Sequence, residues 1–349
     1  MDKEAPAVGI DVSKHKLDIA LLVDGRVRSK SVTNSTTGYH ELKVWLNRCK
    51  VELDECAVCM EATGAYSEPV ALGLQALGLT VSIVNPARIK GFGQSELIRN
   101  KNDGIDAALI ARYCAKMHPE PWHAQPPERR RLRTWCDRLK ALKEMRQQEE
   151  NRLEACTFSA NAELVEHIQR HVNWLSLQIR EIECEIENHI NRHPCLKRDA
   201  DLLRSIPGIG TATIMVMLGH VGDFRRFSSA KALAAHLGVS PRQRSSGSSI
   251  RGRTMMSRTG NRATRSALYM PAVVASRHNP ILRTFAERLH ANGLPKKAAI
   301  GAVMRKLVHL MYAIVRSGIA FTPNYLEQQV EKAAAARRDI SRSEADLQT

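Results

Sequence analysis

Three short segments near the start of the chain alternate apolar and polar residues, which is the pattern of half-buried β-strands. They are AVGIDV with its flanks within residues 6–12, KLDIALLV at residues 16–23, and RVRSKSVTN directly after an Asp-Gly pair at residues 24–25. The Asp-Gly pair favours a tight hairpin turn between the last two strands. The segment therefore predicts a meander of three strands, so the rest of this domain must pack on a sheet.

Helix and strand patterns alternate after the meander. The spacing of apolar residues predicts helices from Ser35 to about Lys50, near residues 66–77 and from Asp103 through Tyr113, and strands at residues 55–61 and 80–85. Val8, Ile10 and Val12 share one face of the first strand, and Asp11 lies on the other. The predicted fold is α/β, with a mixed sheet and covering helices over residues 1–125.

The pattern changes to long helices over residues 126–197. Apolar residues recur at alternating spacings of three and four along two stripes: Leu132, Trp135, Leu139, Leu142 and Leu153, and then Ile168, Val172, Leu175, Ile179, Ile182 and Ile186. Such stripes predict a coiled-coil linker. A helical hairpin within one chain and a coiled coil between subunits both fit them, and the second would make this segment an oligomerisation element.

A mostly helical domain is predicted over residues 198–325, with helices near 228–237, 260–276, 279–291 and 296–317. Its segment IPGIG contains Gly208 and Gly210 and has the glycine turn of a helix-hairpin-helix element, in which backbone N–H groups approach a phosphate. An ordinary turn between helices is the structural alternative. The charged tail over residues 326–349 has few large apolar residues and is predicted to be flexible.

Positive charge is concentrated in one part of the chain. The net charge is +16, and the stretch from Arg242 to Arg316 has fifteen Lys or Arg residues against one acid, Glu287, which is a net charge of +14. A field this one-sided favours a polyanionic partner, of which nucleic acid is the commonest.

No apolar run approaches the ~20 residues of a membrane span, and no signal-peptide pattern precedes the first strand. We therefore expect a cytoplasmic protein. Its eight cysteines are scattered, and Cys56 and Cys59 of CAVC alternate within an apolar run, which favours buried, reduced strand residues over metal ligands.

Four carboxylates occupy positions that suggest a metal site. Asp11 lies within the first strand, Glu61 ends the fourth, and Asp103 and Asp106 begin a helix. Each has a structural alternative, such as solvent exposure or helix capping. Together they have the layout of a ribonuclease-H-like domain, in which clustered acids need divalent cations, Mg²⁺ or Mn²⁺, to offset their repulsion. Asp18 on the second strand is a poorer candidate.

The segment SSGSSIRGR, residues 245–253, places small hydroxyls among arginines. Serine becomes a nucleophile when a base, a metal or nearby cations activate it, and arginines hold phosphate. The chemistry of the residues does not distinguish Ser245, Ser246, Ser248 and Ser249. A metal site that activates water would instead make a junction nuclease, with these serines only in a DNA-gripping loop.

An ordered set of motifs resembles an insertion-sequence transposase family, the one that includes Piv-type DNA invertases and bridge-RNA-guided serine recombinases. The resemblance runs from about residue 7 to 318 through GIDVSK, EATGAY, NPARIKGFGQSELIRNKNDGIDAALIARY, IPGIG, AAHLGVSPRQRSSGSSIRGRTMMSRTGNRATRSALYMPA and AVMRKLVHLMYAIVRSG. It implies a RuvC-like domain, a coiled-coil linker and a C-terminal transposase domain. By motif, the acidic tetrad falls on Asp11, Glu61, Asp103 and Asp106, and the serine on Ser246.

The resemblance further implies a DNA recombinase that forms a covalent phosphoserine with Mg²⁺, acts as a dimer or tetramer, and uses a structured noncoding RNA to pair with target and donor DNA. Expected nucleic-acid contacts are Arg242, Arg244, Arg251, Arg253, Arg258, Arg262, Gly208 and Gly210. Three alternatives remain: a RuvC-like junction nuclease, a Piv-like invertase that reads DNA without RNA, and a non-catalytic scaffold that binds nucleic acid. The acidic tetrad argues against the scaffold, since unneutralised acids repel phosphate.

Overall fold

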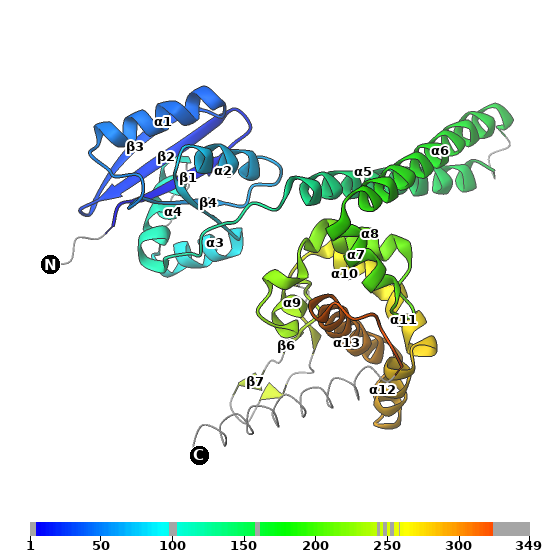
Figure 1. Ribbon diagram of the computed structural model, residues 1–349. Coiled ribbons are helices and arrows are strands. Elements are labelled where there is room, and N and C mark those ends of the chain that lie inside the picture. Colours follow the sequence, from blue (N-terminus) through cyan, green and yellow to red (C-terminus); the bar gives the residue numbers. More distant parts are fainter. Residues whose placement is uncertain are drawn as a thin grey trace, which may run out of the picture. The chain divides into compact units, whose positions relative to one another are not determined.

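The computed structural model describes residues 5–97, 103–157, 161–242, 245–246, 250–251, 255–257 and 259–323 (Figure 1). For residues 103, 157, 245, 246, 250 and 251 it describes the backbone. The predicted flexible tail lies outside the described residues. The chain folds as two compact units, Met1–Ala124 and Gln125–Thr349, and each is considered by itself.

The first unit is built on a five-stranded mixed sheet with the strand order β3-β2-β1-β4-β5. Strands β1 (Ala7–Val12), β2 (Lys16–Val23) and β3 (Arg26–Thr33) form the predicted antiparallel meander, and β4 (Ala57–Glu61) and β5 (Thr80–Val84) continue the sheet in parallel with β1. Asp24 and Gly25 both have positive φ, 47° and 72°, as the predicted tight turn requires. The predicted mixed α/β sheet is confirmed.

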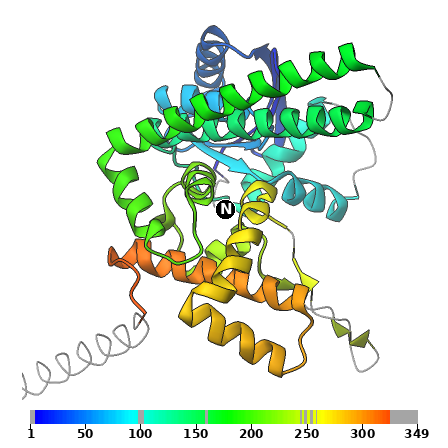
Figure 2. The same ribbon diagram turned by 90° about the vertical axis from the view of Figure 1, so that its right-hand side faces the viewer.

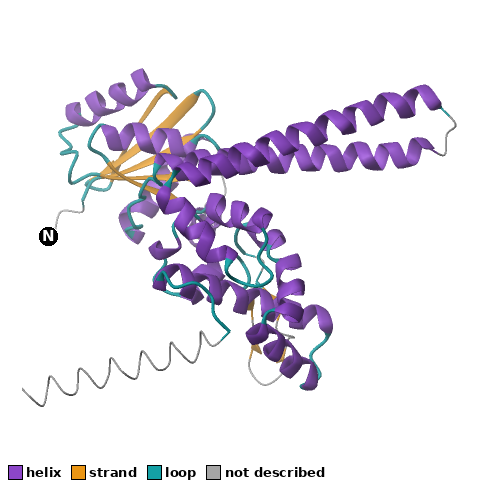
Figure 3. Ribbon diagram, turned by 45° about the vertical axis from the view of Figure 1, so that its right-hand side comes forward, coloured by secondary structure: helices purple, strands orange, loops and turns teal. Residues whose placement is uncertain are grey.

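Helices cover both faces of this sheet (Figure 3). Helices α1 (Thr36–Arg48) and α2 (Ser67–Ala76) pack on the face formed by the apolar side chains of β1 and β2, and α4 (Asp103–Met117) packs on the other face, with α3 (Pro86–Ser95) beside it. Helix α3 was not predicted. Its start is encoded by Asn85, whose side chain accepts a hydrogen bond from the Ala87 N–H, and by a proline in the first turn.

The second unit begins with a long antiparallel helical hairpin made of α5 (Pro127–Thr157) and α6 (Ala162–Arg192). The two predicted apolar stripes face each other across it; most of their residues are buried, and Trp135, Leu153 and Ile182 are half-buried. An ion pair between Lys143 Nζ and Glu183 Oε1, 2.6 Å apart, also joins the helices. Of the two arrangements that the stripes allow, the hairpin within one chain is therefore present.

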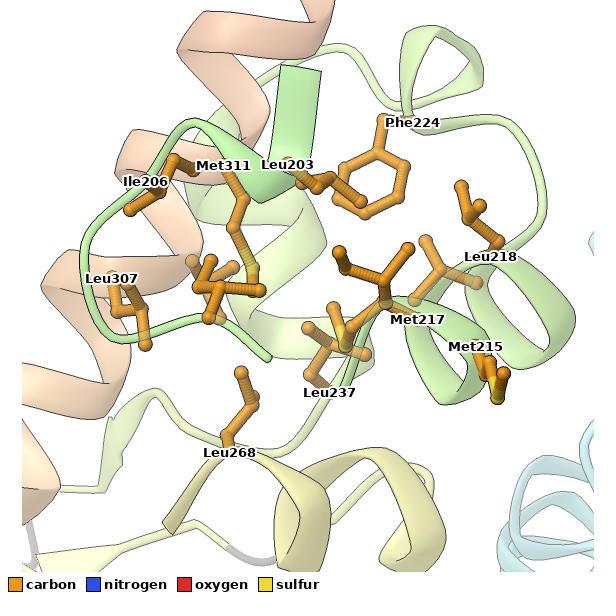
Figure 4. Close-up of a cluster of buried hydrophobic side chains, with 14 of the residues drawn as sticks. Leu203, Ile206, Met215, Met217, Leu218, Phe224, Leu237, Leu268, Leu307 and Met311 are labelled. Atoms are coloured by element: carbon orange, nitrogen blue, oxygen red, sulfur yellow. The ribbon is translucent and has the colours of Figure 1, made fainter. Parts of the chain in front are cut away.

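In the described part of the chain after the hairpin, eight helices pack around one apolar core (Figure 4). They are α7 (Pro194–Arg204), α8 (Thr211–Val221), η1 (Phe224–Arg226), α9 (Ala230–His236), α10 (Arg262–Ala267), α11 (Tyr269–His278), α12 (Pro280–Ala291) and α13 (Lys296–Ser317). The prediction of one continuous helix over residues 260–276 is wrong, because two helices, α10 and α11, cover this segment. The chain instead breaks at the buried Leu268, because Pro271 has no N–H to continue the helical hydrogen bonds.

Helix α13 is long and apolar enough to cross a membrane by length and composition. Its apolar side chains, among them Val303, Leu307 and Met311, are instead buried in the core of the second unit. It is therefore the central core helix of this unit.

A buried ion network joins the base of the hairpin to the helical core. The Asp199 carboxylate, whose side chain is 1% exposed, accepts hydrogen bonds from Arg129, 3.0 Å away, and from two nitrogens of Arg225 at 2.8 and 3.2 Å. Arg129 also donates to the Gly222 carbonyl at 2.7 Å. One carboxylate on α7 thus links the first turn of α5 with the segment that follows α8.

We predict that Asp199→Asn lowers the free energy of unfolding by about 3–5 kcal/mol, because it leaves the buried Arg129 charge without its partner. Asp201→Asn is the matched control: its exposed ion pair with Arg204 is 2.6 Å long and is expected to contribute about 0–1 kcal/mol. Urea unfolding monitored by circular dichroism measures both. Equal effects of the two substitutions would contradict a structural role for the network.

Candidate active site

Helix α4 lies directly on strand β1 at Gly9. A Cβ atom at residue 9 would come within 2.2 Å of both the Ala107 carbonyl oxygen and the Ala111 nitrogen. Ala107 and Ala111 are themselves buried, against Ala20 of β2. Small residues on both sides therefore allow the helix backbone to approach the sheet closely.

This contact determines which strand residues face the helix. Alternate residues of a strand share a face, so Asp11 lies on the same face as Gly9. Gly9 pairs with Cys59 of the parallel strand β4, and Glu61 follows on the Cys59 face. A hydrogen bond with Cys114 of α4, together with burial, raises the pKa of the Cys59 thiol. Asp11 and Glu61 therefore both lie on the α4 side of the sheet, and both are half-buried.

The direction of α4 brings its acids to the same end of the sheet. Near its C-terminal end, Cys114 Sγ lies 3.6 Å from the Ala57 carbonyl oxygen at the start of β4. The helix then passes Gly9, so its first turn lies toward the C-terminal ends of β1 and β4. Asp103 is the first residue of α4, and Asp106, which is half-buried, lies in the same turn. The four acidic positions thus gather at one end of the sheet.

The chemistry of these residues fits a hard divalent cation, since carboxylate oxygens are the ligands that Mg²⁺ and Mn²⁺ prefer. The acids also lie near the N-terminus of a helix, where the helix dipole favours negative charge. Among the side chains that the structure describes, which do not include Asp103, no three His, Cys, Asp or Glu are close enough to form a metal site. Strand register and helix direction therefore place the four positions at the same end of the sheet, while the described side chains of Asp11, Glu61 and Asp106 are not close enough to one another to form a metal site.

Asp18, rated a poorer candidate from sequence, lies directly opposite Asp11 in the antiparallel register of β1 and β2. Opposite residues share a face, so Asp18 lies at the same end of the sheet as the four acids. Its carboxylate forms a 2.9 Å ion pair with Lys16, two residues earlier on that face. The signal was present in the sequence, because Asp11 and Asp18 are equidistant from the turn between the two strands.

The serine segment forms two paired stretches of strand in the second unit. Strand β6 (Pro241–Arg242) pairs with β9 (Met255–Met256), and between them β7 (Ser245–Ser246) pairs with β8 (Ile250–Arg251). Ser246 is paired with Ile250 and is the last strand residue before residues 247–249, which lie outside the described residues. Ser248 and Ser249 fall in that gap, and the backbone alone is described for Ser245 and Ser246.

The predicted phosphate contacts are described in part. Arg242 and Arg262 are exposed, and Arg251 is described by its backbone. Arg244, Arg253 and Arg258 lie outside the described residues.

The glycines of IPGIG form the turn between α7 and α8, where Gly208 has φ of +100°. A Cβ atom there would lie 2.8 Å from the Ala275 nitrogen of α11. The close packing of this turn on α11 therefore accounts for the glycine. Gly210 directly precedes α8. It is exposed, and no atom lies within 4 Å of the position that a Cβ would take there.

Comparison with known proteins identifies the family. A model described as the transposase IS116/IS110/IS902 family matches residues 200–287, and a second transposase model, of the DEDD type of IS110 elements, matches residues 8–157. The chain is 35% identical over 315 residues to the pilin gene-inverting protein of Moraxella lacunata, covering 90% of this chain and 97% of that protein. The chain therefore belongs to the IS116/IS110/IS902 transposase family.

The chain is also similar to other proteins. The pilin gene-inverting protein of Moraxella bovis is 34% identical over 90% of this chain and 97% of its own length. An IS110 element protein of Streptomyces coelicolor is 32% identical over 45% of this chain and 37% of that protein. Among solved structures, T. thermophilus RuvC in complex with a Holliday junction substrate aligns with 34% of this chain and 99% of that chain, at 15% identity and a TM-score of 0.25.

We predict that Gly9→Ala lowers the free energy of unfolding by about 1–3 kcal/mol or more, because the added methyl group displaces the α4 backbone. Gly91→Ala is the matched control, because Gly91 lies in a helix with nothing within 4 Å of its would-be Cβ. It is expected to be neutral or stabilising by up to about 1 kcal/mol. Thermal and urea unfolding test the pair, and a Gly9→Ala protein as stable as wild type would contradict close packing of α4 on β1.

Proposed function

We propose that this chain is a DNA recombinase of an insertion element, which cuts and rejoins DNA through a covalent phosphoserine with the help of Mg²⁺ or Mn²⁺, and which acts in the cytoplasm. The observation that supports this most is the gathering of Asp11, Glu61 and the first turn of α4 at one end of the sheet. Membership of a transposase family and a net charge of +14 over residues 242–316 support DNA as the substrate.

Asp11, Glu61, Asp103 and Asp106 would hold the metal in this proposal. A bound divalent cation would supply positive charge to stabilise the charge that develops at a phosphodiester during exchange. The protein supplies a rigid frame, because two paired strands and a helix packed on them hold the acids. Asp18, held by Lys16, is positioned to support Asp11 from the adjacent strand.

Ser246 is proposed as the nucleophile. Its hydroxyl oxygen would form a bond to phosphorus while the bond from phosphorus to one deoxyribose oxygen breaks, and the proton lost by serine would pass to the departing sugar oxygen. The phosphoserine conserves the energy of the broken phosphodiester, so a DNA hydroxyl can reverse the step on a new partner without another energy source. Arg242 and its neighbouring arginines would bind the phosphate and stabilise its charge.

The acids and the serine lie on separate compact units of the chain. We propose that they meet between protomers of a homo-oligomer, with the acids of one protomer and the serine of another forming each site. The long α5–α6 hairpin is the proposed element that brings protomers together. This arrangement couples cutting to assembly, because an isolated protomer would not form a complete site.

Sequence choice is proposed to come from a structured noncoding RNA that pairs with target and donor DNA. With aromatic residues at 5% of the chain, RNA would be held mainly through its backbone and shape. The near full-length similarity to pilin gene-inverting proteins favours a second candidate, an invertase that reads DNA directly. Recombination that survives treatment of the protein with ribonuclease would favour this second candidate.

We predict that labelled junction DNA from the element forms a covalent adduct with the protein in the presence of Mg²⁺ and co-purified RNA. Denaturing electrophoresis would detect the adduct, and mass spectrometry would place it on Ser246. Ser246→Ala would abolish it, while Ser248→Ala would retain it. Cleaved DNA without any adduct would contradict the serine mechanism and leave a metal-dependent junction nuclease.

A mixture of two inactive variants supplies the control for folding. Ser246→Ala retains the acids and Asp11→Asn retains the serine, so a mixed oligomer with composite sites regains adduct formation on the Asp11→Asn protein. Two variants that stay inactive together, although each binds DNA, would contradict a site shared between protomers.

A further inference from the structure

One face of α13 has basic side chains at successive turns, and this face begins beside strand β9. Gly301 of α13 lies against Met256 of β9, where an added Cβ would be 3.2 Å from the methionine methyl group. Arg305 and His309 follow at successive turns of the helix, so they share the Gly301 face. This row of basic side chains thus starts at β9, whose partner strand β6 comes shortly before Ser245 and Ser246 in the chain (Figure 2, α13 in orange).

Two nitrogen atoms of this row are covered and have no partner. Arg305 Nε and His309 Nε2 are both inaccessible to solvent and make no hydrogen bond to any residue that the structure describes. Burying polar groups without partners costs free energy, so such atoms in a folded protein call for an explanation. Tyr312, one turn further, does find a partner, because its hydroxyl donates to the Phe227 carbonyl at 2.9 Å.

The charged groups that perturb His309 are all positive. Burial, and then the positive charges of Arg305, Lys306 and Lys231, lower the pKa of its imidazole. Lys231 comes from the first turn of α9, which packs against α13. Within the described part of the chain, none of these four side chains forms an ion pair with an acid. The repulsion among them is left uncompensated, and an anion would relieve it.

We propose that Arg305, His309 and Lys231 form a subsite for one backbone phosphate of a nucleic acid, on the face of α13 that begins at β9. A phosphodiester has one negative charge and two unesterified oxygens, which can accept hydrogen bonds from Lys231, whose side chain is exposed, and from the accessible parts of Arg305 and His309, whose side chains are half-buried. None of the three residues contacts base edges in this role, so the subsite positions the strand without reading its sequence.

The subsite makes nucleic-acid binding dependent on pH. Free His309 is neutral near neutral pH because its pKa is lowered. A bound phosphate favours the protonated imidazole and raises that pKa, so binding takes up a proton and the affinity rises as the pH falls. His309 is the group of this cluster whose change of charge makes binding depend on pH.

The test measures DNA binding in the Ser246→Ala background, where no adduct forms. The proposal rests on the proposed function only in requiring that the chain binds nucleic acid, and failure of the serine chemistry therefore leaves this test intact. Arg305→Gln should weaken binding of a duplex oligonucleotide roughly tenfold and reduce the slope of log K against log salt by about one. Arg283→Gln removes the same charge from an exposed position on α12 and is the control.

Arg305→Lys should recover most of the affinity, and circular dichroism checks that each variant is folded. His309→Gln should remove the part of the binding that strengthens as the pH falls toward and below about 6.5, the ordinary pKa of histidine. Equal losses in Arg305→Gln and Arg283→Gln, or an unchanged pH profile in His309→Gln, would overturn the subsite.

Nuclear magnetic resonance of the imidazole separates nucleic acid from free phosphate. The His309 signal, assigned by its absence in His309→Gln, should shift on addition of the duplex oligonucleotide at concentrations where inorganic phosphate has little effect. A shift with inorganic phosphate and none with DNA would show a free-anion site and overturn the proposal, as would no shift with either.

Discussion

The candidate metal site depends on the close contact between helix α4 and strand β1. Residue 9 has no side chain, and the carbonyl of Ala107 and the nitrogen of Ala111 occupy the space where its Cβ would lie. A larger residue at position 9 would displace the helix, and with it the turn that contains Asp103 and Asp106. The small residues Gly9, Ala107 and Ala111 let α4 pack closely on β1. This packing also sets the position of the first turn of α4 relative to the C-terminal ends of β1 and β4.

The second unit contains the basic stretch of residues 242–316, and it is held together by an apolar core and a buried ion network. Its apolar core includes Leu203, Phe224, Leu268 and Leu307, and the charges of Arg129 and Arg225 are offset by the buried Asp199. Arg242 and Arg262 of the basic stretch are exposed. The four candidate acids and the basic stretch lie on separate compact units of the chain.

The sequence predicted most of the fold because its local signals agree with the tertiary structure. The bounds of β2, the Asp-Gly turn and both apolar stripes of the hairpin were predicted closely, since alternation and heptad spacing reflect burial directly. The break at Leu268 was missed because Pro271 lies inside an otherwise helical pattern. Helix α3 was missed because its apolar pattern is weak and its start is marked by Asn85 and a proline alone.

The site was predicted less completely. The carboxylates stood out by residue type, but the role of Gly9 depends on a contact with residues about a hundred positions away, which no local pattern reveals. Asp18 was underrated because its place opposite Asp11 depends on strand register. The choice of Ser246 came from family resemblance, since neighbouring serines have the same chemistry.

The central claim is that packing of α4 on β1 brings four acids into one metal site. Crystals of the protein soaked in Mn²⁺ would test it by anomalous diffraction. We predict manganese bound by Asp11 and Glu61 at the C-terminal ends of β1 and β4, with Asp103 or Asp106 completing its ligands. Well-diffracting crystals with ordered acids and no anomalous peak at this end of the sheet would contradict the claim.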